Sequence, residues 1–252
     1  MADTDPLVYA IGGLVAGGVL FVMGFRWWRQ KKLIEELPTS KIRSIAMGLV
    51  EIKASVVKEK KMLISPFSKK ECVYWRYTIE RWIQTKNGGH WSMVKQDKDM
   101  RPFYVKDNTG EVLVDPDGAT IDTPPDYTKQ TTGTTGLLPG IISFCKTNNI
   151  HNTGFFSGGR MRYREWYIEP GDNLYILGTA GDNPFVKDTT GKKNADDIMI
   201  QKGQNEKFYY ISDKPEESLL KSFRWKVFGG LFGGAALILA GLAYILFRAG
   251  LF

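Results

Sequence analysis

Residues 7–25, LVYAIGGLVAGGVLFVMGF, and residues 227–247, VFGGLFGGAALILAGLAYILF, contain no charged side chain. At about 1.5 Å rise per residue, helices of these lengths reach about 28 and about 31 Å, and the hydrocarbon core of a bilayer is about 30 Å thick. A helix satisfies its own backbone in lipid, so both stretches are predicted to be transmembrane helices. The alternative reading, a buried core helix, usually involves a shorter apolar run.

The overall composition excludes several other classes of protein. The chain has 252 residues, 43% hydrophobic and 24% charged, with a net charge of +7, which rules out a disordered chain, a collagen-like chain and a polytopic transporter. Two cysteines exclude a disulfide scaffold. With only two histidines besides, a four-ligand zinc site needs every one of them or help from carboxylates. We therefore expect no metal and no cofactor.

The flanks of the two apolar stretches predict how the chain sits in the membrane. Indole rings and basic side chains favour the membrane interface, and here they are Arg26, Trp27, Trp28, Arg29, Arg224, Trp225 and Lys226. No basic residue precedes the first stretch, so it is predicted to be an anchor and not a cleaved signal. Basic residues gather on the side of the middle region at both stretches. We expect the central domain to be cytoplasmic and both termini to lie outside.

Small residues recur at four-residue spacing in both apolar stretches. The candidates for close helix packing are Gly13, Gly17, Gly229, Gly230, Gly233 and Gly234. Small ridges let helix backbones approach each other in lipid, so we expect the two spans to pair within one chain. Packing between two copies of the chain is an alternative, and so is the plain abundance of glycine in membrane helices.

Residues 26–226 form the predicted central domain, which ends in a helix from about residue 213 that continues into the second span. Alternating apolar and polar residues separated by short turns predict strands paired as hairpins. One clear hairpin turns at 107–110, where Gly110 is expected to supply a positive φ. A short helix or turn is expected after Pro38. The predicted strands are 49–57, 72–83, 90–95, 102–106, 111–115, 161–168, 173–179, 197–202 and 207–211.

The predicted fold class is therefore a membrane protein in which two transmembrane α-helices flank a mainly antiparallel β (β-rich α+β) domain. Two stretches, 116–140 and 180–196, are rich in Thr, Gly, Pro or polar residues and do not read as strands. They are interpreted as mobile surface excursions, with partner-binding loops as the alternative.

The order of short motifs resembles the GIDE/BAM ("beside a membrane") family. The matching pieces are TSKIRS at 39–44, GLVE at 48–51, CVYWR at 72–76, EVLVD at 111–115, EPGD at 169–172 and ESLL at 217–220. The resemblance implies two spans around the domain and, in eukaryotic members, a RING finger with ubiquitin-ligase activity after the second span. Only five residues follow Phe247, so we expect this chain to lack the eight ligands of a RING.

The sequence contains only weak matches to motifs for nucleotide binding, calcium binding or catalysis. Residues 140–147 miss a P-loop because Cys145 stands at a glycine position, and the acidic turn at Asp115 lacks the full set of calcium ligands. His90 and His151 have no nucleophile at motif spacing. Cys72 is interpreted as a buried, inert thiol, and whether it pairs with Cys145 stays open.

Three arginines, Arg160, Arg162 and Arg164, share one face of a predicted strand. They are a possible partner surface for headgroups or an acidic protein, and the plain alternative is a solvated face paired with local carboxylates. Only Trp166 is expected beside them, and binding of single strands needs several exposed aromatic rings, so no nucleic acid is predicted.

Taken together, these features predict a membrane-anchored binding or scaffolding module without its own catalytic centre. The expected partners are the lipid bilayer and an unknown protein, with homo-oligomers as an option. The alternatives are an enzyme, either a component of an E3 ubiquitin-ligase-like system, as the resemblance implies, or an unrecognised hydrolase, and an accessory subunit of a larger membrane complex.

Overall fold

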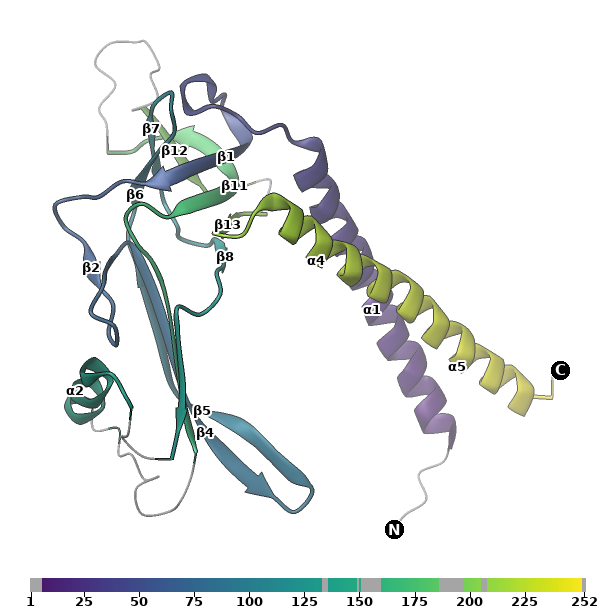
Figure 1. Ribbon diagram of the computed structural model, residues 1–252. Coiled ribbons are helices and arrows are strands. Elements are labelled where there is room, and N and C mark those ends of the chain that lie inside the picture. The colour runs from purple at the N-terminus through teal and green to yellow at the C-terminus, as the bar shows by residue number, and fades with distance from the viewer. Residues whose placement is uncertain are drawn as a thin grey trace. The chain divides into compact units, whose positions relative to one another are not determined.

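The computed structural model describes residues 6–132, 136–148, 150, 160–185, 197–204 and 208–250 (Figure 1). The chain divides into two compact units, a helical unit of Met1–Pro38 with Pro215–Phe252 and a β unit of Thr39–Lys214. The β unit is thus narrower than the predicted domain at 26–226. Most of residues 180–196, His151 and residues 205–207 lie outside the described residues.

The helical unit consists of two long helices that lie side by side. The first is α1 (Pro6–Glu36), and the second runs through α4 (Glu216–Phe228), the π-helical turn η3 (Gly229–Gly233) and α5 (Gly234–Arg248). Both are long and apolar enough to cross a membrane. Two long apolar helices therefore flank a central β-rich domain, as predicted for a two-span membrane protein.

Helix α1 continues well beyond the apolar stretch that predicted it. Ion pairs at i, i+4 support its last turns, with Lys31 Nζ 2.6 Å from Glu35 Oε1 and Lys32 Nζ 3.2 Å from Glu36 Oε1. The helix ends at Glu36 because Pro38 disfavours helical backbone at the residue before it. The short helix or turn expected after Pro38 is the 3-10 turn η1 (Ile42–Ser44).

Five strands of the β unit close into a barrel. Neighbouring strands are paired in the order β1–β6–β7–β12–β11, and β11 pairs with β1 to close the barrel. The β7–β12 pair is parallel, and the other pairs are antiparallel. Numbered along the chain, this order is 1-2-3-5-4-1, the strand order of the OB-fold, which defines an architecture and not a function. The strands are β1 (Gly48–Val56), β6 (Phe103–Lys106), β7 (Glu111–Val114), β11 (Asn173–Asp182) and β12 (Ile198–Gln201).

The barrel encloses an apolar core, because alternate residues of each strand point to its interior. Ile52, Phe103, Val114, Ile176 and Ile200 are almost completely buried there. Packing of this kind stabilises a domain by roughly 1.5–3 kcal/mol per large apolar side chain buried.

The β6–β7 hairpin forms where the sequence predicts it, but a different residue holds its turn. Gly110 has no positive φ. Instead, Asp107 Oδ1 accepts hydrogen bonds from the backbone N–H groups of Thr109 (2.6 Å) and Gly110 (3.1 Å), and its Oδ2 accepts from Ile42 (3.1 Å). Burial raises the pKa of Asp107, but these hydrogen bonds outweigh it and hold the pKa below its usual value.

Two chain insertions between barrel strands build a second, four-stranded antiparallel sheet in the order β5–β4–β10–β9. Helix α2 (Pro139–Thr147) packs on one face through Ile141, against Phe67, Tyr77 and Tyr163. Gly140 is required here, because a Cβ atom would lie 2.0 Å from the carbonyl oxygen of Phe67. The strands are β4 (Tyr74–Thr85), β5 (Gly88–Met100), β9 (Tyr127–Thr131) and β10 (Met161–Ile168).

Three details of the predicted β domain are wrong. Residues 116–140 are not one loop, because they contain β8 (Thr120–Asp122), β9 and the start of α2; β9 is a polar edge strand whose composition hides it. Strands β10 and β11 lie in different sheets. Strands β12 and β13 (Tyr210–Ser212) do not form a hairpin, because both pair with the long strand β11. A small hairpin, β2 (Leu63–Ile64) with β3 (Glu71–Cys72), completes the unit.

Candidate functional site

Glycines bring the two long helices into backbone contact. A Cβ atom on Gly230 would lie 2.7 Å from Cα of Gly24, and one on Gly234 would lie 2.7 Å from the backbone nitrogen of Phe21. On the other helix, a Cβ on Gly17 would lie 2.9 Å from the carbonyl oxygen of Gly234. The helices approach this closely only because these positions carry no side chain.

The contact combines one four-residue step, from Gly230 to Gly234, with seven-residue steps from Gly17 to Gly24 and from Gly234 to Gly241. The four-residue pattern proposed Gly13, Gly229 and Gly233 as well, but nothing lies within 4 Å of a Cβ at these positions. It missed Gly24 and Gly241, which follow Gly17 and Gly234 by two helical turns. A search at heptad spacing finds both, since seven residues return to the same helix face.

The residues predicted to lie at the membrane interface differ in how far their side chains are exposed. Trp27 packs inward, with an indole carbon 3.1 Å from the Cβ position of Gly230. Trp28 and Trp225 are 44% and 68% exposed. The basic residues Arg26, Arg29, Arg224 and Lys226 are exposed as well. Trp28 and Trp225 therefore suit the headgroup layer, and Trp27 serves the contact between the helices.

The outer face of the four-stranded sheet carries the three predicted arginines. Strand pairing brings tryptophans and a fourth arginine from β4 and β5 onto the same face. Trp82 lies opposite Trp91, and Trp166 lies opposite Arg76. The expectation that Trp166 is the only aromatic residue beside these arginines is therefore wrong. We name this surface the Arg–Trp face; it consists of Arg76, Trp82, Trp91, Arg160, Arg162, Arg164 and Trp166.

Each tryptophan of the Arg–Trp face has a guanidinium stacked on it. Arg160 lies 4.9 Å from the ring centroid of Trp82, and Arg162 lies 4.4 Å from that of Trp91. Two guanidinium groups lie over the ring of Trp166, that of Arg76 at 5.0 Å and that of Arg164 at 5.3 Å from its centroid. Such contacts are worth about 0.5–1 kcal/mol each at partly exposed sites and hold the long side chains in place.

One buried carboxylate anchors this array. Glu80, which is 6% exposed, accepts a hydrogen bond from Arg162 Nε at one oxygen and from an Arg164 terminal nitrogen at the other, at 2.7 Å. Burial raises the pKa of Glu80, but the hydrogen bonds and positive charges of these two arginines outweigh it and hold the pKa below its usual value. Glu80 is therefore ionised at neutral pH.

A pocket of about 440 Å³ opens at the barrel end of this face. It has two cationic side chains, Arg76 and Lys98, beside the carboxylate of Asp97. The pocket is open and mixed in polarity, and so suits a polar group of a partner. The other lining residues are Tyr74, Gln96, Met100, Ala119 and Ile121.

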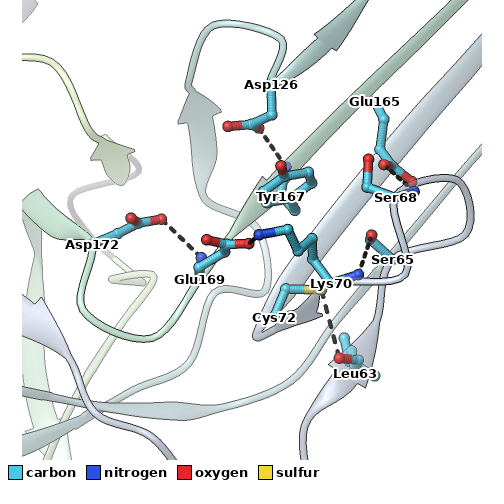
Figure 2. A network of polar contacts seen from close by, with 10 residues as sticks. All are labelled: Leu63, Ser65, Ser68, Lys70, Cys72, Asp126, Glu165, Tyr167, Glu169 and Asp172. Carbon is cyan, nitrogen blue, oxygen red and sulfur yellow. Dashed lines mark hydrogen bonds and ion pairs between the residues drawn. The ribbon is translucent and has the colours of Figure 1, made fainter.

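A second polar network lies close to Cys72 (Figure 2). Glu165 is fully buried, and its two oxygens accept the backbone N–H groups of Phe67 (2.6 Å) and Ser68 (2.9 Å). Lys70 pairs with Glu169 at 3.2 Å, and its backbone N–H donates to Ser65 Oγ at 3.0 Å. The carboxylate of Glu165 thus holds the turn at 65–68 against strand β10.

The thiols in the structure are buried and unpaired. Cys72 and Cys145 are both free. Burial, then the negative charges of Glu165 and Glu169, raises the pKa of Cys72 to about 12, and burial raises the pKa of Cys145. Neither thiol is a nucleophile at neutral pH. Within the described ranges, no three His, Cys, Asp or Glu side chains are grouped so that they could hold a metal ion.

These features define a two-span membrane protein with a β-rich domain between its spans. A family model described as "GIDE: E3 Ubiquitin ligase" matches residues 75–245, from β4 to α5. The chain belongs to the GIDE family. A search of the curated proteins and a search of the solved structures found no match.

Proposed function

We propose that this chain is a membrane-anchored binding or scaffolding module that recruits a protein through the Arg–Trp face. The observation that supports it most directly is the ordered array of four guanidinium groups on three tryptophan rings. Arginine and tryptophan dominate the energetic centres of protein interfaces. Side chains already held in place lose less conformational entropy on binding, so the array is suited to recognition.

The proposed partner segment is acidic. Glu80 compensates Arg162 and Arg164 in part, while Arg76 and Arg160 are exposed at the two ends of the face. Arginine binds carboxylates through paired N–H groups, and the Arg76 end opens into the pocket that Lys98 also lines. An acidic peptide lying along the strands meets cations at both ends.

The test uses the full chain in lipid nanodiscs and two fluorescent peptides of equal length, one rich in glutamate and one with glutamine in its place. Fluorescence anisotropy is expected to show binding of the acidic peptide only, and weaker binding at higher salt. Arg76→Glu or Arg160→Glu should weaken it at least about tenfold, given the cost of apposed like charges. Lys106→Glu, on a barrel strand, is the matched control. Equal binding of both peptides contradicts the proposal.

A second candidate is suggested by the family description. We propose as the alternative that the chain is one component of an E3 ubiquitin-ligase-like system. The 252 residues contain two cysteines and two histidines, fewer than the eight ligands of a RING, so in this proposal the RING lies outside these residues. Ubiquitin chain formation with activating and conjugating enzymes is expected only when a RING-containing partner is added. Activity without such a partner contradicts this division of labour.

A further inference from the structure

The far end of the β4–β5 hairpin differs from the rest of the sheet. We define the hairpin tip as residues 81–95. Among the described residues, strand β10 pairs with β4 as far as Arg81, and a further bond runs from Trp82 N to Arg160 O at 2.8 Å. Within the part of the chain that the structure describes, the hairpin extends beyond this point as a two-stranded ribbon (Figure 1). An isolated two-stranded ribbon is only marginally stable in water, so it requires a further surface.

Contacts within the hairpin tip nevertheless fix its conformation. The two tryptophans pack edge to face, with ring centroids 5.3 Å apart. The Trp82 ring lies directly over Gly89, where a Cβ atom would lie 2.4 Å from it. At the turn, Gln84 Nε2 and Thr85 Oγ1 both donate to the carbonyl oxygen of Gly88, at 3.1 and 2.8 Å. The shape of the tip is therefore set before any partner binds.

Apolar side chains are exposed on this ribbon. Ile83, Met93 and Val94 are 41%, 45% and 39% exposed, whereas solvated strands normally carry polar residues at such positions. Met93 pairs with Glu80 and lies on the face of Trp82 and Trp91, whereas Ile83 lies on the opposite face, so the ribbon exposes apolar side chains on both of its faces. Exposed apolar patches mark sites that are covered by a partner or by a membrane.

The charge changes sign along the same hairpin. Residues 81–95 include three basic side chains, Arg81, Lys86 and Lys95, and no acidic one. The next stretch, 96–100, includes Asp97 and Asp99. The stretch of the hairpin that exposes apolar side chains is therefore also the stretch whose charged side chains are all basic. Tryptophans, basic residues and short apolar side chains together are the composition of a membrane interface.

The geometry points to a third membrane contact: we propose that the hairpin tip inserts into the headgroup layer of an anionic bilayer. The β unit is joined to apolar helices at Pro38 and at Pro215, so bilayer is close to it by covalent linkage. The exposed side chains of Ile83, Met93 and Val94 then enter the interface while Lys86, at the turn, meets lipid phosphates. This inference rests on the two spans and not on the proposed acidic partner.

The test places an environment-sensitive fluorophore on Met93→Cys in the full chain, in vesicles containing phosphatidylserine. The matched control carries the label on Asp99→Cys, on the same strand outside the hairpin tip. Native Cys72 and Cys145 are buried and do not take up label. We expect spin-labelled lipid headgroups to quench the label at 93 about threefold more than the label at 99, because interfacial aromatic and basic residues sit at headgroup level. Aqueous iodide should show the reverse order.

Every outcome decides the proposal. Equal iodide quenching at both positions overturns it. Protection from iodide without quenching by lipid also overturns it and identifies a protein, or a second copy of the chain, as the cover. Lys86→Glu should reduce the lipid quenching in phosphatidylserine vesicles and leave it unchanged in phosphatidylcholine alone. The peptide assay at Arg76 is independent, so failure of one result is distinguishable from failure of the other.

Discussion

Arg162 and Glu80 face each other across strands β10 and β4, joined by a hydrogen bond from Nε to Oε2. Arg164 binds the second oxygen of the same carboxylate. We predict that Glu80→Gln lowers the free energy of unfolding by about 1–2 kcal/mol, since two charge-assisted hydrogen bonds are lost and the arginines are about a quarter exposed. Chemical denaturation of the full chain measures it. Glu71→Gln, which breaks an exposed pair with Lys58, should change little.

The same carboxylate gives a pH dependence with a defined sign. The pKa of Glu80 is lower in the folded than in the unfolded chain, because the two arginines outweigh the effect of burial. Its contribution is therefore complete above the ordinary pKa of a glutamate and is lost as the pH falls through the lowered value. Unfolding curves between pH 6 and about 3 should show a smaller acid loss in Glu80→Gln than in the parent chain. Equal losses contradict the assignment.

Asp126 is predicted to affect the pH dependence of stability in the opposite direction to Glu80. Burial raises its pKa, the hydrogen bond from the Tyr167 backbone N–H lowers it, and the charges of Asp172 and Asp213 raise it further. The folded state then binds a proton more tightly, so stability rises as the pH falls towards the ordinary range of an aspartate. Asp126→Asn keeps an acceptor for Tyr167 and should be more stable than the parent at pH 7. Asp117→Asn, at another exposed position, is the control; a loss of stability in Asp126→Asn alone contradicts the prediction.

Two neighbouring glycines, one inside the contact between the helices and one outside it, allow a direct test of that contact. Gly230→Ile is expected to separate the helices, because a side chain there meets Gly24 backbone, and overpacking of this kind costs about 1–3 kcal/mol. Gly229→Ile, one residue away with nothing within 4 Å, should be tolerated. Crosslinking between cysteines at Tyr9 and Tyr244, which line one groove between the helices, reports the separation in detergent. Equal crosslinking in both variants excludes Gly230 as a contact.

The two thiols provide a measure of folding. Because burial and nearby carboxylates raise the pKa of Cys72 to about 12, we expect no reaction with a thiol reagent at pH 8 in the folded chain. Both thiols should react once the protein is denatured. Rapid reaction of either in the native state would show that these side chains are accessible.

The orientation in the membrane is predicted from basic residues at both spans. A reporter enzyme that is active only outside the cytoplasm, fused after Phe252, is expected to be active. The same reporter inserted at Asn108, in a barrel turn, should be silent. The reverse pattern places the central domain on the other side of the membrane.

The spans were predictable because crossing a bilayer needs only a local run of apolar residues. The Arg–Trp face was predicted only in part, because alternation along one strand identifies Arg162 and Arg164 but not their neighbours. Trp82 and Trp91 lie about 70 residues or more earlier in the chain, and only the strand register brings them beside those arginines. Similarly, β8 and β9 are short polar strands that exist through pairing, and local propensity does not reveal them.

The barrel order has a consequence for synthesis at the ribosome. The strand that closes the barrel, β12, ends at Gln201, and the helix leading into the second span begins at Glu216. The domain therefore stays incomplete until almost all of it has been made, when the first apolar helix has long since emerged. Until β12 has been synthesised, the nascent chain is held by its first apolar helix alone and exposes an unpaired strand edge.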